Sequence, residues 1–385
     1  MTAVAEAAAT ETGEAPLALI DHHVHGYVTG EVDAATLESL ITESSAPPAP
    51  GTTPFDSQLG FAVRRWCAPV LGLEPHAPAA EYLRRRAELG AAEAARLLLT
   101  AARMHAWLVD TGFQSDAVTT PEVLAQTSGS PAYEVARIES IAERLVRSGS
   151  SAAGFGADLA GAVHAAAATA VGFKTVAAYR YGLDLEPQRP GPAEVEAAAS
   201  AWLRSVADGE PVRLTDQVLI RHGIWTALDT GLPLQFHAGH GDTDSRLVRA
   251  DPALLQDFLA ASEHTGTPVM LLHCYPYHRQ AGAMAQLFPH VYMDVGEALN
   301  HVGARSAAVL AEALELTPFH KMLYSSDAFG LPELHYLGAA GFRRDIATVT
   351  GEFVADGAWS AGDAGRVAAL IGSQNAERVY RLGDR

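Results

Sequence analysis

The sequence predicts an α/β protein whose fold is a distorted (β/α)8 barrel, a TIM barrel, with a helical insertion between the first two strands. Short apolar runs that end in polar residues or glycine recur along the chain, as is typical of buried parallel strands. Segments with helical spacing of apolar residues lie between these runs. An open doubly wound sheet is the weaker alternative, because no G-x-G-x-x-G pattern follows the first predicted strand.

Eight segments are predicted as strands, because each combines an apolar run with a following turn. They cover residues 17–26, 105–113, 132–139, 172–180, 232–239, 268–276, 291–296 and 321–330. Three intervening segments, 214–231, 252–266 and 304–316, have the apolar spacing of helices. The first two of these end in glycine, which is a common helix terminator.

The remaining length is expected to form a tail and two insertions. A barrel needs about 250 residues, and the chain has 385. Residues 1–16 are acidic and rich in alanine, without the basic start of a signal peptide, so they are predicted to be a flexible tail before a barrel domain at 17–385. Residues 27–104 contain a Pro/Ser/Thr-rich connector and Arg-rich helical stretches, which would form a cap over the barrel mouth, a dimer surface, or an extra helical layer without a role at the site. Residues 181–212 are expected to add one more helix.

Composition excludes several classes of partner. The net charge of −18 argues against a nucleic-acid or anionic-membrane partner, since both need a basic face. No stretch approaches the 18 or so continuous apolar residues of a membrane span. Two cysteines cannot build a disulfide framework, so a reducing cytoplasm is the simplest location. The chain is therefore expected to be a cytoplasmic enzyme with a small-molecule substrate.

Histidines and one aspartate fall at predicted strand ends. His23 and His25 end the first strand, and residues two apart on a strand face the same side, so both imidazoles can reach one metal ion. His237, His273 and Asp327 follow the fifth, sixth and eighth strands. In a barrel these ends meet at one mouth, where active sites lie. Imidazole with carboxylate suits zinc, manganese or iron(II) better than magnesium.

Lys174 lies in the predicted fourth strand of a chain that otherwise uses arginine for nearly every cation. Only one other lysine, Lys321, is present, and it begins the eighth strand at the opposite end of the barrel, where a structural role is expected. A buried lysine can lose its proton, whereas arginine cannot. Lys174 is therefore a candidate base, a candidate carbamate bridge between two metals, or a substrate ligand. The structural alternative is an ion pair with Glu139 at the end of the third strand.

Further polar residues lie in the loops at the same end of the barrel, where a substrate would bind. Arginine's planar fork suits a substrate carboxylate. The candidates for substrate binding are Arg180, Tyr181, His240, Tyr275, Tyr277 and Arg279. His278 and His335 are weaker candidates of the same kind.

The order H-x-H, His, His and Asp after strands one, five, six and eight resembles the amidohydrolase superfamily. More closely, the chain resembles the amidohydrolase-related group that occurs alone or fused to a glutamine-synthetase-like domain in nodulin-like and fungal sporulation proteins. The resemblance extends from about residue 18 to the carboxyl terminus. The segments that carry it are DHHVHG, VDTGF, GFKTVAAYRYGLDL, LPLQFHAGHGDTD, LLHCYPYHRQAG, VYMDVG, YSSDAFGLPELHYLGA and NAERVYRL.

The resemblance implies a barrel that binds one or two divalent ions, most simply Zn²⁺, with Mn²⁺ or Fe²⁺ as alternatives. It implies that His23, His25, His237 and Asp327 are metal ligands. His273 would be a ligand of a second ion or a catalytic histidine. Lys174 would correspond to the lysine that is carbamylated in members with two metals, and so would count as both a ligand and a catalytic group.

The expected activity is hydrolysis of an amide or another C–N bond in a small carboxylate-bearing substrate. Asp327 would take a proton from water and pass it to the leaving amine, while His273 would stabilise the oxyanion. The likeness to domains fused with glutamine synthetase suggests a γ-glutamyl amide. Non-oxidative decarboxylation of a small acid is the alternative reaction, and a non-catalytic module derived from the barrel is the third. A homodimer formed through residues 27–104 is also expected.

Overall fold

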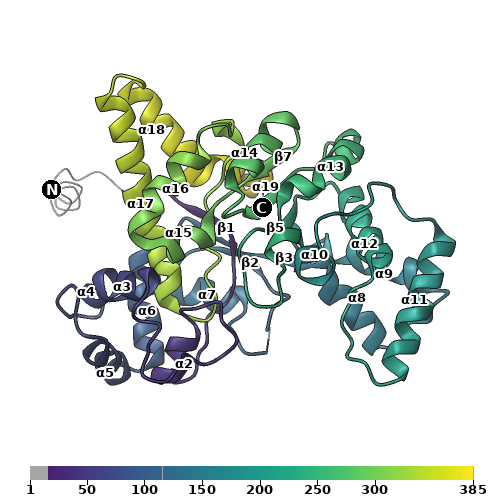
Figure 1. The fold of residues 1–385 in the computed structure, drawn as a ribbon, viewed down its shortest axis with the longest axis horizontal. Helices are drawn as coiled ribbons and strands as arrows, with labels where there is room; N and C mark the ends of the chain where they lie inside the picture. Colours follow the sequence, from purple (N-terminus) through teal and green to yellow (C-terminus); the bar gives the residue numbers. More distant parts are fainter. Residues whose placement is uncertain (1–15, 115, 385) are drawn as a thin grey trace.

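The computed structural model describes residues 16–114 and 116–384, so the predicted tail lies almost entirely outside the described residues. Seven parallel strands follow one another in the sheet in chain order. Helices lie around this central sheet (Figure 1). Their bounds are β1 (Ile20–Val24), β2 (Ala106–Asp110), β3 (Ala132–Arg137), β4 (Gly172–Thr175), β5 (Leu234–Ala238), β6 (Val269–His273) and β7 (Val291–Met293). Consecutive parallel strands of this kind, joined by helices, confirm the predicted barrel fold.

The eighth segment closes the barrel without forming a regular strand. The amide of Leu323 donates to the carbonyl of Met293 at the end of β7. Farther along, the amide of Asp327 donates to the carbonyl of His23, and the amide of His25 donates to the carbonyl of Ala328. Asp327 has a φ of +51°, which interrupts the extended conformation. The prediction of a regular strand over 321–330 is therefore wrong, although the segment lies where the eighth strand belongs.

The fourth strand is shorter than predicted. It ends at Thr175, and Ala177–Arg180 forms the short helix α10. The carboxylate of Glu139 accepts hydrogen bonds from the Thr175 hydroxyl (2.6 Å) and the Val176 amide (3.0 Å). Because these bonds satisfy the end of the strand locally, the chain turns away from the sheet there. Lys174 is consequently the penultimate residue of β4.

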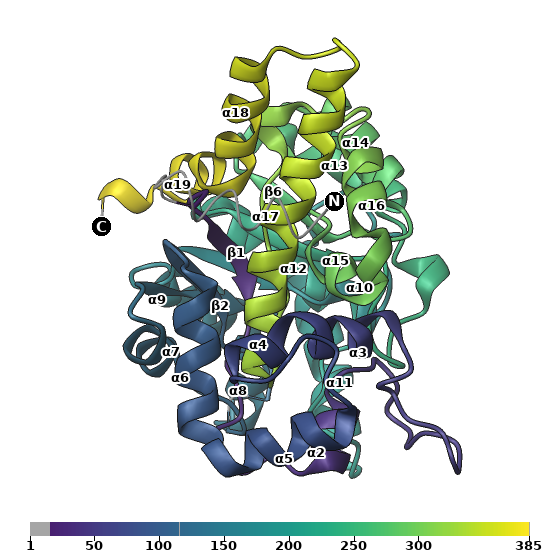
Figure 2. The same ribbon diagram turned by 90° about the vertical axis from the view of Figure 1, so that its left-hand side faces the viewer.

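The insertion at 27–104 consists of short helices that pack beside the barrel. They are α2 (Ala34–Ser39), α3 (Gln58–Ala62), a π-helical turn (Val63–Cys67), α4 (Ala68–Val70), α5 (Ala79–Leu89) and α6 (Ala91–Ala102). Helix α6 packs against the long helix α17 (Pro332–Ala355), as both views show (Figures 1 and 2). A buried ion pair between Arg86 Nε and Glu333 Oε1, 2.7 Å apart, joins the two parts.

The remaining helices surround the sheet. They are α7 (Pro121–Ser128), α8 (Ile138–Arg147), α9 (Phe155–Ala166), α11 (Pro192–Ala207), α12 (Gln217–Asp229), α13 (Gln256–Ser262), α14 (His278–Leu287), α15 (Gly296–Val302), α16 (Ser306–Ala313), α18 (Ala361–Ala369) and α19 (Asn375–Tyr380). Helices α12 and α16 lie within two of the predicted helical segments, while 252–266 contains α13 flanked by 3-10 turns. Among the described helices, none combines the length and the apolar composition needed to cross a membrane.

Helix α19 covers the amino-terminal end of the barrel. Its side chains join a buried apolar cluster with residues from the strands, including Ile20, Leu108 and Met270. The Tyr380 hydroxyl lies 3.1 Å from His22 Nδ1 and 2.8 Å from Gln235 Nε2, directly below the predicted site. The chain therefore closes the barrel bottom, and the opposite end remains for chemistry.

Candidate metal centre

The end of β1 places its histidines in different environments. The pairing of β1 with β2 shifts register between Asp21 and Val24, so the strand does not alternate regularly. His22 points into the barrel, where its Nε2 lies 2.8 Å from Asp294 Oδ2. His23 and His25 instead approach Asp327. His22 is thus part of the support beneath the site.

Asp327 is the point at which three histidines meet. Its Oδ1 lies 3.0 Å from His23 Nε2 and 3.3 Å from His25 Nε2. Its Oδ2 lies 3.3 Å from His273 Nε2. Burial by itself would raise the pKa of Asp327, but these imidazoles hold it well below its usual range. The carboxylate is therefore ionised and lies next to three imidazole nitrogens.

The backbone around this point is strained. His273, Cys274 and Asp327 all have positive φ values, of 66°, 58° and 51°. Residues other than glycine adopt this conformation at an energetic cost, and such residues concentrate at functional sites. In this structure they direct the β6 and eighth-segment side chains toward each other. The local strain therefore coincides with the candidate ligands.

Lys174 belongs to the same cluster. Its Nζ lies 3.3 Å from His23 Nε2, and the side chain is almost fully buried. Glu139, the alternative partner considered from the sequence, instead accepts from Thr175 and Val176. Burial lowers the pKa of Lys174 to about 8, although the charge of Asp327 opposes this change. A neutral amine is therefore accessible near physiological pH.

His237 completes the group that the sequence predicted. Its ring centroid lies 4.9 Å from that of His273 and 4.3 Å from that of Tyr179. Burial lowers the pKa of His237 well below its usual value, and the charge of His273 adds to this effect. Burial likewise lowers the pKa of His23 to about 3 and that of His273 to about 4. All three imidazoles are therefore neutral at pH 7, as metal ligands must be.

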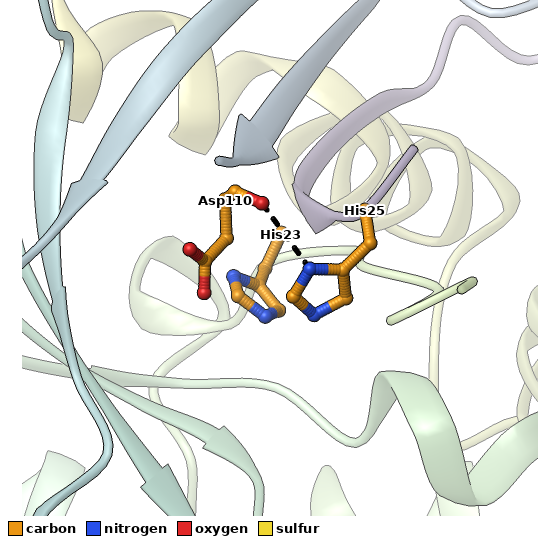
Figure 3. A group of neighbouring side chains, drawn as sticks. All are labelled: His23, His25 and Asp110. Atoms are coloured by element: carbon orange, nitrogen blue, oxygen red, sulfur yellow. Dashed lines mark hydrogen bonds between the residues drawn. The ribbon is translucent and has the colours of Figure 1, made fainter. Parts of the chain in front are cut away.

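Two imidazoles, those of His23 and His25, are oriented by hydrogen bonds to Nδ1, the ring nitrogen that does not face Asp327. His23 Nδ1 donates to Gln235 Oε1 at 2.8 Å, which leaves Nε2 with a lone pair. His25 Nδ1 donates to the carbonyl of Asp110 at 3.2 Å, as the dashed line in Figure 3 marks. Such outer contacts fix the tautomer of a ligating histidine. The structure thus presents two Nε2 lone pairs toward Asp327.

Asp110, at the end of β2, was not singled out from the sequence. Its carboxylate lies close to His23 and His25, and the three offer ligand atoms within 4.8 Å of one another (Figure 3). The carboxylate also accepts from Arg137 Nε at 3.1 Å and Nη2 at 2.5 Å. Because Arg137 neutralises it, Asp110 is better suited to supporting the histidines than to binding an ion. The sequence signal that could have identified Asp110 is its position at the end of an apolar strand.

The donor set fits a divalent ion. His237 Nε2 and both ring nitrogens of His273 are buried without a hydrogen-bond partner among the described residues. Unpaired buried polar atoms are rare and require an explanation. Neutral imidazoles with an ionised carboxylate form a ligand set for Zn²⁺, Mn²⁺ or Fe²⁺. His23, His25, His237, His273 and Asp327 would hold it, with Lys174 beside them.

The centre opens into a cavity of about 310 Å³. Phe113, Phe329 and Tyr179 give its wall an aromatic part. The wall also carries three arginines and several acidic side chains: Arg137, Arg180, Arg213, Glu43, Asp242, Asp244 and Glu297. This volume suits a small molecule rather than a polymer.

Of the residues predicted to bind substrate, the structure places Arg180 on the cavity wall, with its Nη1 3.1 Å from Glu143 Oε1. The others are not among the lining residues. Tyr181 packs beneath the Arg249 guanidinium, Tyr275 stacks on His278, and Arg279 pairs with Glu315. Tyr277 directly precedes α14 and lies outside the lining, and the His240 ring lies 5.6 Å from that of His301.

His335 lies beneath the metal centre and is not part of the cavity wall. Its Nε2 lies 2.9 Å from the carbonyl of His25, and its Nδ1 lies 3.0 Å from the carbonyl of Leu331. The side chain is fully buried in α17. It therefore links the long helix to the backbone of a candidate ligand.

Comparisons with known proteins agree with this geometry. Residues 136–382 match the family model described as Amidohydrolase. Protein fluG of Emericella nidulans is 33% identical over 228 residues, which make up 56% of this chain and 26% of that protein. The chain therefore spans about a quarter of this curated relative's length.

Solved structures resemble the chain over nearly its whole length. A Lactobacillus casei protein considered a metal-dependent hydrolase is 28% identical, with a TM-score of 0.85 and 98% of each chain covered. A uronate isomerase of Bacillus halodurans is 12% identical, with a TM-score of 0.63 over 99% of this chain and 97% of that one. At that identity the second likeness concerns the fold alone.

Proposed function

The chain belongs to the amidohydrolase family, and we propose that it is a metal-dependent hydrolase that cleaves an amide or another C–N bond of a small carboxylate-bearing substrate. One observation carries the proposal. The Asp327 carboxylate lies 3.0–3.3 Å from the Nε2 atoms of three histidines, at the wall of a cavity sized for a small molecule. We infer that the chain binds one or two divalent ions. Zn²⁺ is the first ion to test, followed by Mn²⁺ and Fe²⁺.

When bound, a divalent ion supplies Lewis-acid chemistry, since it activates water and polarises a carbonyl. Asp327, ionised and partly exposed to the cavity, would accept the proton of the attacking water and pass it to the leaving nitrogen. His273, with unpaired ring nitrogens, would stabilise the negative charge that develops on the carbonyl oxygen. Lys174 would support the ligand cluster from below, next to His23.

The arginines on the cavity wall are suited to bind a substrate that carries a carboxylate. Arg137 is held by Asp110, and Arg213 lies 3.0 Å from Asp244, so both are already neutralised. Arg180 approaches Glu143, yet its Nη1 is buried without a hydrogen bond of good geometry. We therefore propose Arg180 as the group that binds the substrate carboxylate. Tyr181, His240, Tyr275, Tyr277 and Arg279 remain proposals for contacts made by a longer substrate.

Within this class we propose γ-glutamyl amides as the first substrates to test. The test is a panel of γ-glutamyl amides incubated with Zn²⁺- or Mn²⁺-loaded enzyme, with released amine and glutamate measured by chromatography. Release of both products at equal rates is the expected result. Asp327→Asn should reduce the rate by several orders of magnitude, because the acid–base group is lost. No release from any member of the panel would overturn the substrate proposal.

Non-oxidative decarboxylation is the competing reaction for the same centre. Running the panel in H₂¹⁸O separates the two, because hydrolysis places ¹⁸O in the released carboxylate, whereas decarboxylation releases CO₂. The expected result is ¹⁸O incorporation without CO₂.

Both cysteines, Cys67 and Cys274, are free and buried, which supports the proposal that the enzyme works in a reducing cytoplasm.

A further inference from the structure

A second group of ligand-type side chains lies on the cavity wall, apart from Asp327. Glu43, in the loop after α2, places its Oε1 3.3 Å from His301 Nε2. Glu297 and His301 are four residues apart on α15, so they share one face of that helix. The three side chains offer ligand atoms that all lie within 4.8 Å of one another. Two segments distant in sequence therefore converge on one point.

Glu297 is the reason to assign this group a ligand. The residue is 5% exposed, and its Oε2 is buried without a hydrogen-bond partner among the described residues. A buried carboxylate is costly unless a cation or hydrogen-bond donors compensate it. Of the three arginines of the same wall, Arg137 and Arg213 pair with Asp110 and Asp244, and Arg180 lies next to Glu143. None of these three arginines therefore pairs with Glu297.

We propose that Glu43, Glu297 and His301 form a second cation site, for a divalent transition ion of the Mn²⁺ or Zn²⁺ type. Two carboxylates with one imidazole are a ligand set for such ions. The His240 ring, 5.6 Å from that of His301, adds a second imidazole beside the site.

This site would place a positive centre on the wall of the substrate cavity. Both Glu297 and Asp327 line the cavity, so an anionic group of a bound molecule could contact an ion at the Glu297 cluster while its reacting bond lies at Asp327. The proposal concerns ion binding and holds whether or not the chain hydrolyses amides. Its test therefore needs no substrate.

The experiment is equilibrium dialysis of chelator-treated full-length protein against MnCl₂, with bound manganese counted by mass spectrometry. The wild type is expected to bind one more Mn²⁺ per chain than Glu297→Gln or Glu43→Gln. Asp327→Asn should lose manganese from the other centre and retain the ion at this one. The side chain of Glu43 is 34% exposed in a loop, so its substitution leaves the fold intact even if Glu297→Gln does not fold.

Asp244→Asn is the matched control. Asp244 lines the same cavity and is 61% exposed, and its loss removes one negative charge without removing a proposed ligand. The control should keep the wild-type manganese count. If Glu43→Gln and Glu297→Gln also keep that count, the cluster is not a metal site, and the proposal is overturned. A loss shared equally by all three variants would also overturn it, because it would reflect general charge rather than ligation.

Discussion

Gln235 decides which nitrogen His23 presents to a metal. Its Nε2 donates to the carbonyl of His22 at 2.7 Å and to the Tyr380 hydroxyl at 2.8 Å, which fixes the orientation of the amide. Its Oε1 must then face His23, where it accepts from Nδ1. The buried amide of Gln235, held by Tyr380 at the barrel bottom, thus fixes the tautomer of His23 at the metal centre.

We predict that Gln235→Leu lowers Zn²⁺ affinity by about 10- to 100-fold, as loss of an outer contact to a ligating histidine usually does. The measurement is competition with a chromogenic chelator at pH 7.5. Gln256→Leu, on the exposed surface of α13, is the control and should bind zinc as the wild type does. Equal affinities for both variants would contradict a positioning role for Gln235.

Lys174 and Lys321 make a matched pair, since they are the two lysines of the chain. Lys174 Nζ lies against His23, whereas Lys321 Nζ donates to the carbonyls of Ala285 (2.7 Å) and Phe288 (2.6 Å). If Lys174 bridges two ions as a carbamate, Lys174→Ala should lose about one metal ion per chain, measured by elemental analysis. Lys321→Ala should lower the melting temperature and keep the metal. Unchanged metal content in Lys174→Ala would leave this lysine with a substrate or structural role.

At the scale of elements, one buried ion pair joins the helical insertion to α17. The side chains of Arg86 and Glu333 are both buried, with exposed fractions of 3% and 0%. Tyr82 also donates its hydroxyl to Glu333 Oε1 at 3.0 Å. Removing one partner of such a pair leaves a charge without compensation in the interior.

We predict that Arg86→Met lowers the free energy of unfolding by about 3–5 kcal/mol, the usual effect of breaking a buried pair. Urea titration followed by circular dichroism measures it. Arg96→Met, which breaks an exposed pair with Glu93, should cost less than about 1 kcal/mol. The double variant Arg86→Met/Glu333→Gln should recover part of the loss, and a further loss would contradict the explanation.

The segment before β7 makes stability depend on pH. Burial, with the nearby charge of Lys321, lowers the pKa of His290 from its ordinary 6.5 to about 4. The unfolded chain therefore binds this proton at a higher pH than the folded chain does. The stabilising contribution is complete above about pH 6.5 and is lost as the pH falls toward 4.

We predict that His290→Gln reduces the loss of stability between pH 7 and pH 4.5. Urea titrations of the variant and the wild type at both pH values provide the measurement. His264→Gln, at an exposed histidine of the turn before β6, is the control and should follow the wild type. A variant with the same pH slope as the wild type would contradict the assignment to His290.

At the scale of the whole molecule, a homodimer through residues 27–104 remains a prediction. Phe61 in this insertion is 54% exposed, beside a groove that Trp66, Leu299 and Leu337 help to line. We expect light scattering after gel filtration to give twice the 40.6 kDa chain mass. Phe61→Glu should shift the protein toward monomer, whereas Leu287→Glu, at a 62% exposed leucine of α14, should not. A monomeric wild type would overturn the prediction.

The sequence by itself determined the barrel and the main ligand candidates. Apolar runs ending in His23, His25, His237 and His273 are local features, and parallel topology brings strand ends together wherever they lie in the chain. A family resemblance pointed to the same positions. This reasoning succeeds because strand order follows chain order here, so that no long-range pairing had to be known.

Only the tertiary structure decided which other groups face the centre. Gln235 is one of many polar residues in strands, and Glu43, Glu297 and His301 lie in a loop and on a helix that carry no motif. The irregular eighth segment and the early end of β4 also depend on contacts with His23 and Glu139, far away in sequence. Periodicity describes which face of one element is buried. Packing of separate elements determines which side chains meet, and that information is not local.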